Sequence, residues 1–188
     1  AERFSVKTLP LEVDVAREAD CERLIGTTVS TLGGLDLLVN NAGIGEGGTV
    51  LETSTQDFDR VLKTNLYGTF WCSRAAFSVM QHNRGRPRGF IVNIASLAGK
   101  EAWSGTGAYS ASKFGVMALT YAMADEGKAL EIKVAAVCPA MVATAMTGVQ
   151  GPEYLQPEDC AETVLYLLKL SPAAWPVEIV LPRKGASE

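Results

Sequence analysis

The sequence contains a single histidine, His82, and only four cysteines in 188 residues. Those cysteines are Cys21, Cys72, Cys138 and Cys160, and no two of them form a C-x-x-C pair. Zinc sites and disulfide frameworks are recognised by clustered, regularly spaced ligands, so the pattern predicts neither. Unpaired thiols are typical of a reducing compartment, and we therefore expect a cytoplasmic protein.

Long apolar runs and a surplus of basic residues are also missing. No run approaches the ~18 apolar residues of a membrane-spanning helix, and the first residues lack the apolar core of a signal peptide. The 17 Lys and Arg are outnumbered by 21 Asp and Glu, which gives a formal net charge of -4 at pH 7. We therefore expect no membrane span, no secretion and no nucleic acid as the main partner.

The composition is that of an ordinary globular protein. Hydrophobic residues make up 47% and charged residues 20%, and the 18 glycines are scattered rather than periodic. These values argue against a fibrous or disordered chain. A chain of this length can bury a sizeable core without disulfides or metal, so we expect one domain over residues 1–188.

Strand and helix patterns alternate along the chain. Strands are predicted at 9–13, 35–39, 90–94, 132–137 and 177–181, and helices at 16–31, 54–80, 109–126 and 157–170. The 9–13 strand contains Pro10, which lacks an N–H and fits an edge position best. The alternation predicts right-handed β-α-β crossovers, and therefore an α/β fold with a doubly wound parallel sheet.

Tyr109 and Lys113 stand four residues apart in one predicted helix, so their side chains lie on one face, one turn apart. A nearby cation typically lowers the pKa of an acid by about 1–3 units, which would make the Tyr109 phenol a credible proton donor or acceptor. The spacing alone also allows a simpler interpretation, a buried tyrosine beside a solvated lysine.

Further polar residues follow the predicted strands. They are Asp14, Asn40 to Gly43, Ser96 and Pro139 to Thr144. In a parallel sheet the carboxyl ends of the strands share one edge, where ligands bind. The helix with Tyr109 and Lys113 begins soon after Ser96 and reaches the same edge. Each of these residues also allows a purely structural interpretation as a turn former, a strand end or a helix cap.

In this order, the motifs resemble those of the short-chain dehydrogenase/reductase family. The resembling segments are Asp14, Asn40-Asn41-Ala42-Gly43, Thr64-Asn65, Ala95-Ser96-Leu97-Ala98-Gly99, Tyr109-x-x-x-Lys113 and Pro139 to Thr144. The resemblance implies a Rossmann-like fold and an oxidoreductase that transfers a hydride between NAD or NADP and a small alcohol or carbonyl substrate. It also implies self-association as a homodimer or homotetramer.

The resemblance implies a role for each matching residue. Tyr109 would be the general acid and base, and Lys113 would lower its pKa and hold the nicotinamide ribose. Ser96 would hydrogen-bond the substrate oxygen, and Asn65 would hold a water that links Lys113 to solvent. No metal is implied. The implied cofactor-binding residues are Asp14, Asn40, Ala42, Gly43, Tyr109, Lys113, Pro139 and Thr144.

The sequence departs from the family pattern in two places. Pro139-Ala140 stands where the family has Pro-Gly, which adds a methyl group close to the nicotinamide position. The first two β-α units of the family, including the glycine-rich pyrophosphate loop, have no counterpart, so the chain resembles an N-terminally truncated member. We expect these residues to belong to a longer chain. The alternative function is a binding or assembly module without competent cofactor binding.

Two surfaces are predicted from residue positions. We expect an apolar substrate pocket beside Ser96, lined by Leu97, Trp103, Met141, Val142 and Met146. We also expect self-association through the 54–80 and 109–126 helices, because each carries a second apolar stripe that the sheet cannot cover. On the 109–126 helix the stripe consists of Phe114, Ala118 and Tyr121.

Overall fold

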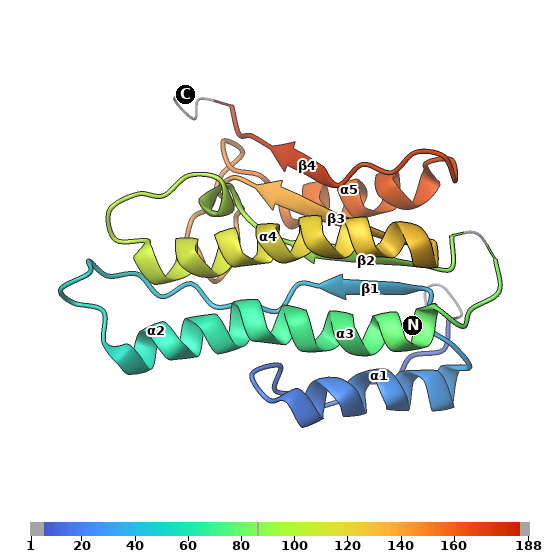
Figure 1. The fold of residues 1–188 in the computed structure, drawn as a ribbon. Coiled ribbons are helices and arrows are strands. Elements are labelled where there is room, and N and C mark those ends of the chain that lie inside the picture. Colours follow the sequence, from blue (N-terminus) through green and yellow to red (C-terminus); the bar gives the residue numbers. More distant parts are fainter. Residues whose placement is uncertain (1–5, 86, 185–188) are drawn as a thin grey trace.

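Four parallel strands form the sheet at the centre of the computed structural model, which describes residues 6–85 and 87–184 (Figure 1). The strands are β1 (Leu37–Asn40), β2 (Gly89–Ile94), β3 (Ile132–Pro139) and β4 (Glu178–Leu181), and they are hydrogen-bonded in that order. All three neighbouring pairs are parallel, with Leu38 opposite Ile91 and Ile91 opposite Val134. The predicted parallel sheet is confirmed over these four strands.

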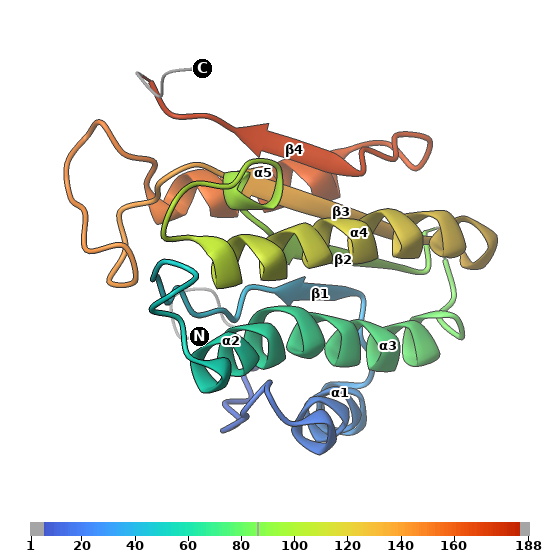
Figure 2. The ribbon, with the colours of Figure 1, turned by 60° about the vertical axis from the view of Figure 1, so that its left-hand side comes forward.

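Helices cover both faces of the sheet (Figures 1 and 2). They are α1 (Glu18–Leu32), α2 (Thr55–Leu62), α3 (Gly68–Met80), α4 (Gly107–Leu130) and α5 (Pro157–Lys169). On one face, α3 and α4 pack against β1, β2 and β3, while α1 packs on α3. On the other face, Leu167 of α5 packs against Phe90 and Val137. Within the described ranges, no helix is both long and apolar enough to cross a bilayer.

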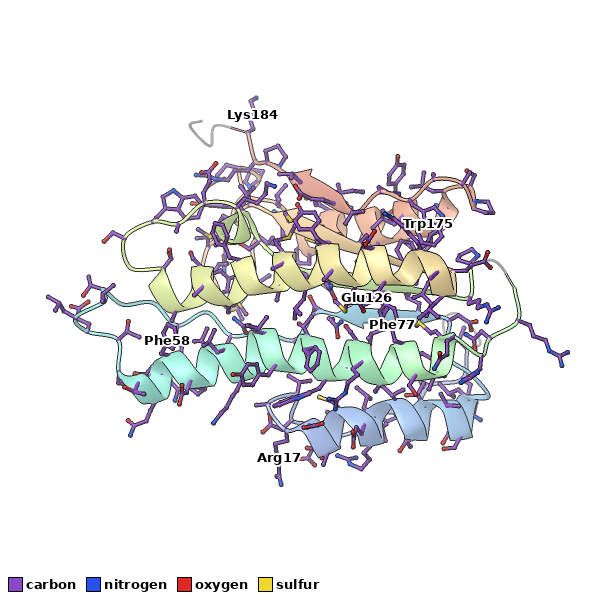
Figure 3. The ribbon with its side chains drawn as sticks, in the orientation of Figure 1. Arg17, Phe58, Phe77, Glu126, Trp175 and Lys184 are labelled. Atoms are coloured by element: carbon purple, nitrogen blue, oxygen red, sulfur yellow. The ribbon has the colours of Figure 1, made fainter. Side chains whose placement is uncertain are left out.

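The largest hydrophobic core cluster among the described residues lies between the sheet and the α1, α3 and α4 layer. It contains the buried side chains of Ile25, Met80 and Ile91, and Phe77 of α3 packs against it (Figure 3). The apolar strand runs in the sequence exist because side chains on both faces of these strands are covered. The doubly wound arrangement is therefore confirmed.

The helix predicted over 54–80 is continuous but not uniform. It begins with α2, where the Ser54 hydroxyl caps the helix by accepting a hydrogen bond from the Asp57 N–H at 3.0 Å. It then widens into one π-helical segment, η2 (Lys63–Tyr67), before continuing as α3. Such π turns are rare inside helices and are frequent at functional sites. The π turn contains Asn65.

The strand predicted at 9–13 is wrong, because these residues form neither strand nor helix. A strand needs a neighbour to receive its hydrogen bonds, and β1 is paired only with β2 in the described part of the chain. The segment instead lies against α1, where Arg23 donates to the Glu12 carbonyl at 2.8 Å and Lys7 donates to the Thr31 carbonyl at 2.6 Å. Its apolar alternation indicated a strand, but alternation cannot show whether a partner strand is present.

A buried polar network joins the strands to the helices beneath them. Asn40 at the end of β1 donates to Ser73 Oγ at 2.9 Å and to Asn93 Oδ1 at 2.8 Å. Asn93 in turn donates to Thr120 Oγ1 in α4 at 2.8 Å. Buried polar groups are costly unless paired, so a satisfied network of this kind specifies one packing of the two helices on the sheet.

The close approach of α4 to β3 gives a stability prediction. A Cβ at Gly127 would lie 2.2 Å from the Ile132 carbonyl oxygen, whereas a Cβ at Gly26 in α1 would meet no atom within 4 Å. We expect Gly127→Ala to lower the free energy of unfolding by about 1–3 kcal/mol through overpacking. The matched control Gly26→Ala should raise it by about 0.5–1 kcal/mol, because alanine is the better helix former. Urea unfolding measures both, and an unchanged midpoint for Gly127→Ala would contradict the packing described.

Candidate active site

The candidate site lies at the carboxyl edge of the sheet. Figure 1 shows the four strands pointing toward the same side as the first turn of α4. Ser96 follows β2, and α4 brings Tyr109 and Lys113 to this edge. The convergence follows from topology, since each parallel strand ends at this edge and α4 starts there before running back along the sheet.

Lys113 is an ammonium group enclosed by protein. Only 7% of the residue is exposed, and its Nζ donates to the Ile94 carbonyl at 2.8 Å. The same Nζ lies 5.6 Å from the centroid of the Tyr109 ring. Burial disfavours the charged form and lowers the pKa of Lys113 to about 8. The side chain therefore gains or loses its proton close to physiological pH.

The pKa of the Tyr109 phenol shifts in the direction opposite to the one that the sequence predicted. Burial raises the pKa of the Tyr109 phenol, and an interaction with the Ser96 hydroxyl partly opposes that rise. The sequence predicted a lowered pKa caused by Lys113. That expectation is not met, because burial is the largest influence on this pKa, and Lys113, whose Nζ donates to the Ile94 carbonyl, is not among the groups that shift it. The structure nevertheless brings Ser96, Tyr109 and Lys113 together.

Ser96 is held by the short turn that it begins. Its Oγ accepts a hydrogen bond from the Ala98 N–H at 3.1 Å and caps η3 (Leu97–Gly99). At the end of this turn, a Cβ at Gly99 would lie 2.8 Å from the Lys113 carbonyl oxygen. Only glycine permits this backbone contact, so Gly99 sets the Ser96 turn directly against the Lys113 turn of α4.

The Asn65 side chain binds the backbone of the loop that follows β1. Asn65 is 1% exposed, and its side chain pairs with both backbone groups of Ile44, through Ile44 N to Oδ1 at 2.8 Å and Nδ2 to Ile44 O at 2.9 Å. The neighbouring Gly43 is so close that a Cβ there would lie 3.3 Å from Asn65 Oδ1 and 3.8 Å from Lys113 Nζ. Gly43 therefore lies beside both the Asn65 side chain and the Lys113 ammonium group. The roles that the sequence predicted for Asn65 and Gly43 stay predictions.

Sequence reasoning missed Ser112, which lies between Tyr109 and Lys113. Its hydroxyl is fully buried, receives a hydrogen bond from Asn65 Nδ2 at 3.0 Å and donates to the Tyr109 carbonyl at 2.6 Å. The one available signal was its place three residues after Tyr109, on the same side of the helix. The Asn65 contact spans 47 positions and could not be read from spacing.

Asn40, Ala42 and Pro139, which were also predicted to bind the cofactor, differ in how far their side chains are available to a ligand. Asn40 spends both of its side-chain donors within the protein, on Ser73 and Asn93. Pro139 is buried at the end of β3, opposite Leu181. Ala42 is exposed on the loop between β1 and Asn65. Side-chain contact with a ligand is therefore open to Ala42, while Asn40 can offer only its remaining backbone groups and side-chain oxygen.

Asp14 and Thr144 lie on the surface. Asp14 precedes α1, where its Oδ1 accepts from the Ala16 N–H at 3.0 Å. Thr144 lies on the loop after β3, where its N–H donates to Thr147 Oγ1 at 3.2 Å. Within the described ranges, no hydrogen bond joins either residue to Tyr109 or Lys113, so their assignment remains a prediction.

The residues present fit the ribose of a nicotinamide cofactor. An ammonium group has three N–H donors, and Lys113 Nζ uses one of them on Ile94. Gly43 leaves open the space beside that ammonium which a side chain would fill. Two remaining donors next to a glycine backbone are suited to hold sugar hydroxyl groups. Lys113 and Gly43 thus fit such a ligand, and the other predicted cofactor-binding residues stay a prediction.

The predicted substrate pocket coincides with neither of two surface cavities of the described residues. One cavity of about 240 Å³ lies between α2, the loop before it and the first turn of α4. Its lining includes Glu46, Asp57 and Arg60, and Arg60 pairs with Glu46 at 2.6 Å and with Asp57 at 2.7 Å. The other cavity, of about 210 Å³, borders Lys133 at the opposite edge of the sheet. The pocket beside Leu97 and Trp103 therefore stays a prediction.

The buried lysine gives a prediction for stability against pH. Below about pH 8 both folded and unfolded chains hold the Lys113 proton, and the cost of burying the charge is fully present. Between about pH 8 and the ordinary value of 10.5, only the unfolded chain keeps that proton, so stability rises with pH. We expect this contribution to be on the order of 1–3 kcal/mol.

Denaturant unfolding of the wild type and of Lys113→Met across this range measures the effect. Burial raises the pKa of Cys21 to about 12 and of Cys138 to about 11, and these thiols give the opposite trend in both proteins. The difference between the two proteins therefore reports the Lys113 proton together with its electrostatic interaction with Cys138. Parallel stability curves for wild type and Lys113→Met would refute the assignment.

The comparisons with known proteins agree with this geometry. Residues 1–154 match the family described as short chain dehydrogenase. The chain is 40% identical over 147 residues to 2-(R)-hydroxypropyl-CoM dehydrogenase of Xanthobacter autotrophicus, covering 77% of this chain and 58% of that protein. It is 33% identical over 167 residues to an uncharacterized oxidoreductase of Staphylococcus aureus, covering 87% of this chain and 70% of that protein.

Solved structures show the same fold. An alcohol dehydrogenase from Thermococcus sibiricus, complexed with 5-hydroxy-NADP, matches with a TM-score of 0.89 and 23% identity over 100% of this chain and 79% of its own. A putative short-chain alcohol dehydrogenase from Sinorhizobium meliloti matches with a TM-score of 0.81 and 28% identity. The match covers 94% of this chain and 77% of the other. These matches do not favour the alternative of a non-catalytic module. The chain belongs to the short-chain dehydrogenase/reductase family of NAD- or NADP-dependent oxidoreductases.

Proposed function

We propose that this protein transfers a hydride between NAD or NADP and a small alcohol or carbonyl compound, with Tyr109 as the general acid and base. The observation that carries the proposal is the enclosure of Lys113, with Tyr109 on its own helix and Ser96 and Gly43 brought beside it from two other segments. Family membership supports the same reaction class.

The residues around Lys113 would hold the cofactor. When bound, it supplies the hydride or accepts it, which no amino-acid side chain can do. Lys113 and Tyr109 would bind the ribose, and the backbone of Ala42 and Gly43 would line its path. Pro139 and Thr144 would border the nicotinamide, and Asp14 would lie toward the adenine.

The proton steps follow from the positions of Ser96 and Tyr109. In carbonyl reduction, negative charge develops on the substrate oxygen, where the Ser96 hydroxyl donates a hydrogen bond and Tyr109 delivers its proton. Alcohol oxidation runs in reverse, with Tyr109 accepting the proton. Lys113 in its charged form stabilises the phenolate. Its lowered pKa also lets it pass a proton onward, through the water proposed at Asn65.

The setting of the reaction is part of the proposal. We propose that residues 1–188 form one domain and that the protein works in the cytoplasm. The four cysteines are free in the structure, and three of them are buried, which suits a reducing compartment.

Replacing the phenol tests the reaction directly. We expect Tyr109→Phe to lose more than nine-tenths of turnover while cofactor affinity changes by no more than about threefold, because the missing proton matters only in the transition state. Nicotinamide absorbance with a panel of small alcohols measures turnover. Tyr121→Phe is the matched control, since Tyr121 lies on the same helix and its hydroxyl donates a hydrogen bond to Glu178, away from the site. A Tyr109→Phe variant with more than a tenth of wild-type turnover would refute the role of Tyr109.

Self-association is proposed through the exposed apolar side chains of α3 and α4. Phe70 on α3 and Phe114 and Tyr121 on α4 are 40%, 44% and 49% exposed, and Ala118 continues the α4 stripe. We expect light scattering to find a dimer or tetramer at micromolar concentration. Phe114→Glu should shift it toward monomer, because a charge would be buried in the interface. A wild-type monomer under these conditions would count against this surface.

A further inference from the structure

Ser112 has a hydroxyl group whose two hydrogen-bonding roles are both used inside the protein. It donates to the carbonyl of Tyr109 at 2.6 Å, one helical turn earlier. It accepts from Asn65 Nδ2, on the neighbouring π turn, at 3.0 Å. The side chain has no exposure to solvent, so water cannot replace either partner. Ser112 is therefore a fixed link between α4 and the turn η2.

The link continues beyond Asn65 to the loop that follows β1. Asn65 holds both the N–H and the carbonyl of Ile44, which is the residue after Gly43. The position of a Gly43 Cβ is 3.8 Å from Lys113 Nζ. A chain of buried hydrogen bonds thus runs from the Tyr109 carbonyl through Ser112 and Asn65 to the loop beside Lys113.

Close packing of α4 on η2 accompanies this series of hydrogen bonds. A Cβ at Gly115, one turn beyond Ser112 on α4, would lie 2.8 Å from Leu66 Cδ2 on η2. A larger residue would have to displace the Leu66 side chain, so glycine permits the close packing of α4 on η2 at this point. The wider π turn carries Asn65 at this contact, and such turns are retained mainly where a side chain must be placed for function.

We propose that Ser112 is a positioning residue that fixes Tyr109 and the Gly43 loop relative to one another on the two sides of Lys113. The inference rests on the proposed function, because it assigns the link to the geometry of that reaction. Small displacements of reacting groups lower turnover much more than they lower binding. Loss of the link should therefore reduce kcat and leave KM nearly unchanged.

Three variants test the role of the hydroxyl. Ser112→Ala removes it, Ser112→Cys keeps a similar volume but hydrogen-bonds weakly, and Ser110→Ala is the matched control. Ser110 is buried two residues earlier on α4, and its hydroxyl contacts Thr106 Oγ1 at 2.9 Å rather than Asn65. We expect kcat to fall about ten- to a hundredfold in both Ser112 variants, with KM for the alcohol within about threefold of wild type. Ser110→Ala should keep kcat within about threefold.

A second measurement needs no turnover. The Ile44 N–H is bonded to Asn65 Oδ1, so hydrogen exchange at Ile44 reports whether Asn65 is still held. We expect this amide to exchange at least about tenfold faster in both Ser112 variants than in wild type, and at the wild-type rate in Ser110→Ala. Exchange is followed by NMR or by mass spectrometry of the peptide over residues 41–47.

The outcomes separate this inference from the proposed function. If wild type turns over and the Ser112 variants keep wild-type kcat, the positioning role is overturned while the reaction stands. A wild-type-like Ser112→Cys would overturn the hydrogen-bond link in favour of packing alone, and it decides the matter if Ser112→Ala does not fold. If wild type oxidises no alcohol tested, the proposed function fails, and Ile44 exchange alone decides whether Ser112 holds Asn65.

Discussion

The burial of one ammonium group, that of Lys113, is the constraint on which the site depends. A charge removed from water must be compensated by nearby acceptors, and the structure supplies the Ile94 carbonyl at 2.8 Å. In the described part of the chain, no carboxylate forms an ion pair with it. The charged form of Lys113 is therefore held, within the described residues, by a backbone carbonyl and not by a carboxylate. In the proposed function, hydroxyl oxygens of the cofactor beside Gly43 would add further acceptors for this ammonium group.

Close backbone contacts and buried amides enclose that ammonium group. Gly99 lets one loop approach the Lys113 backbone more closely than any side chain would allow, and Gly43 leaves free the space beside the Lys113 ammonium group. Asn65 satisfies the backbone of the Gly43 loop, while the Ser96 hydroxyl caps the turn that ends at Gly99. Gly43 lies between β1 and α2, Asn65 lies in η2, and Ser96 and Gly99 lie between β2 and α4. All of these segments meet α4. The site is thus precise because rigid elements, and not one flexible loop, set its dimensions.

The sequence was sufficient for features that depend on local pattern and on parallel topology. The apolar run before Ser96 is observed as β2, and the helix with Tyr109 and Lys113 begins near its predicted start and ends within a few residues of its predicted end. Their common edge follows once the strands are parallel. Features that depend on distant partners were not readable. The 9–13 segment had strand alternation but no neighbouring strand, and the contact of Ser112 with Asn65 spans 47 positions. The π turn was not readable either, because a single turn with one extra residue inside an α-helix leaves no distinctive residue type in the sequence.

The pKa of Tyr109 shows why composition could not settle the chemistry. The motif places a cation one turn away, which alone would lower the pKa of the phenol, but burial acts on both groups and favours their neutral forms. It raises the pKa of Tyr109 and lowers that of Lys113. For the proposed reaction this matters, because a phenol that keeps its proton at neutral pH is in the form that carbonyl reduction needs. Alcohol oxidation needs the phenolate, which becomes more populated as the pH rises. In the proposed reaction, burial of Tyr109 would therefore favour its role as an acid near neutral pH, and its role as a base would need a higher pH.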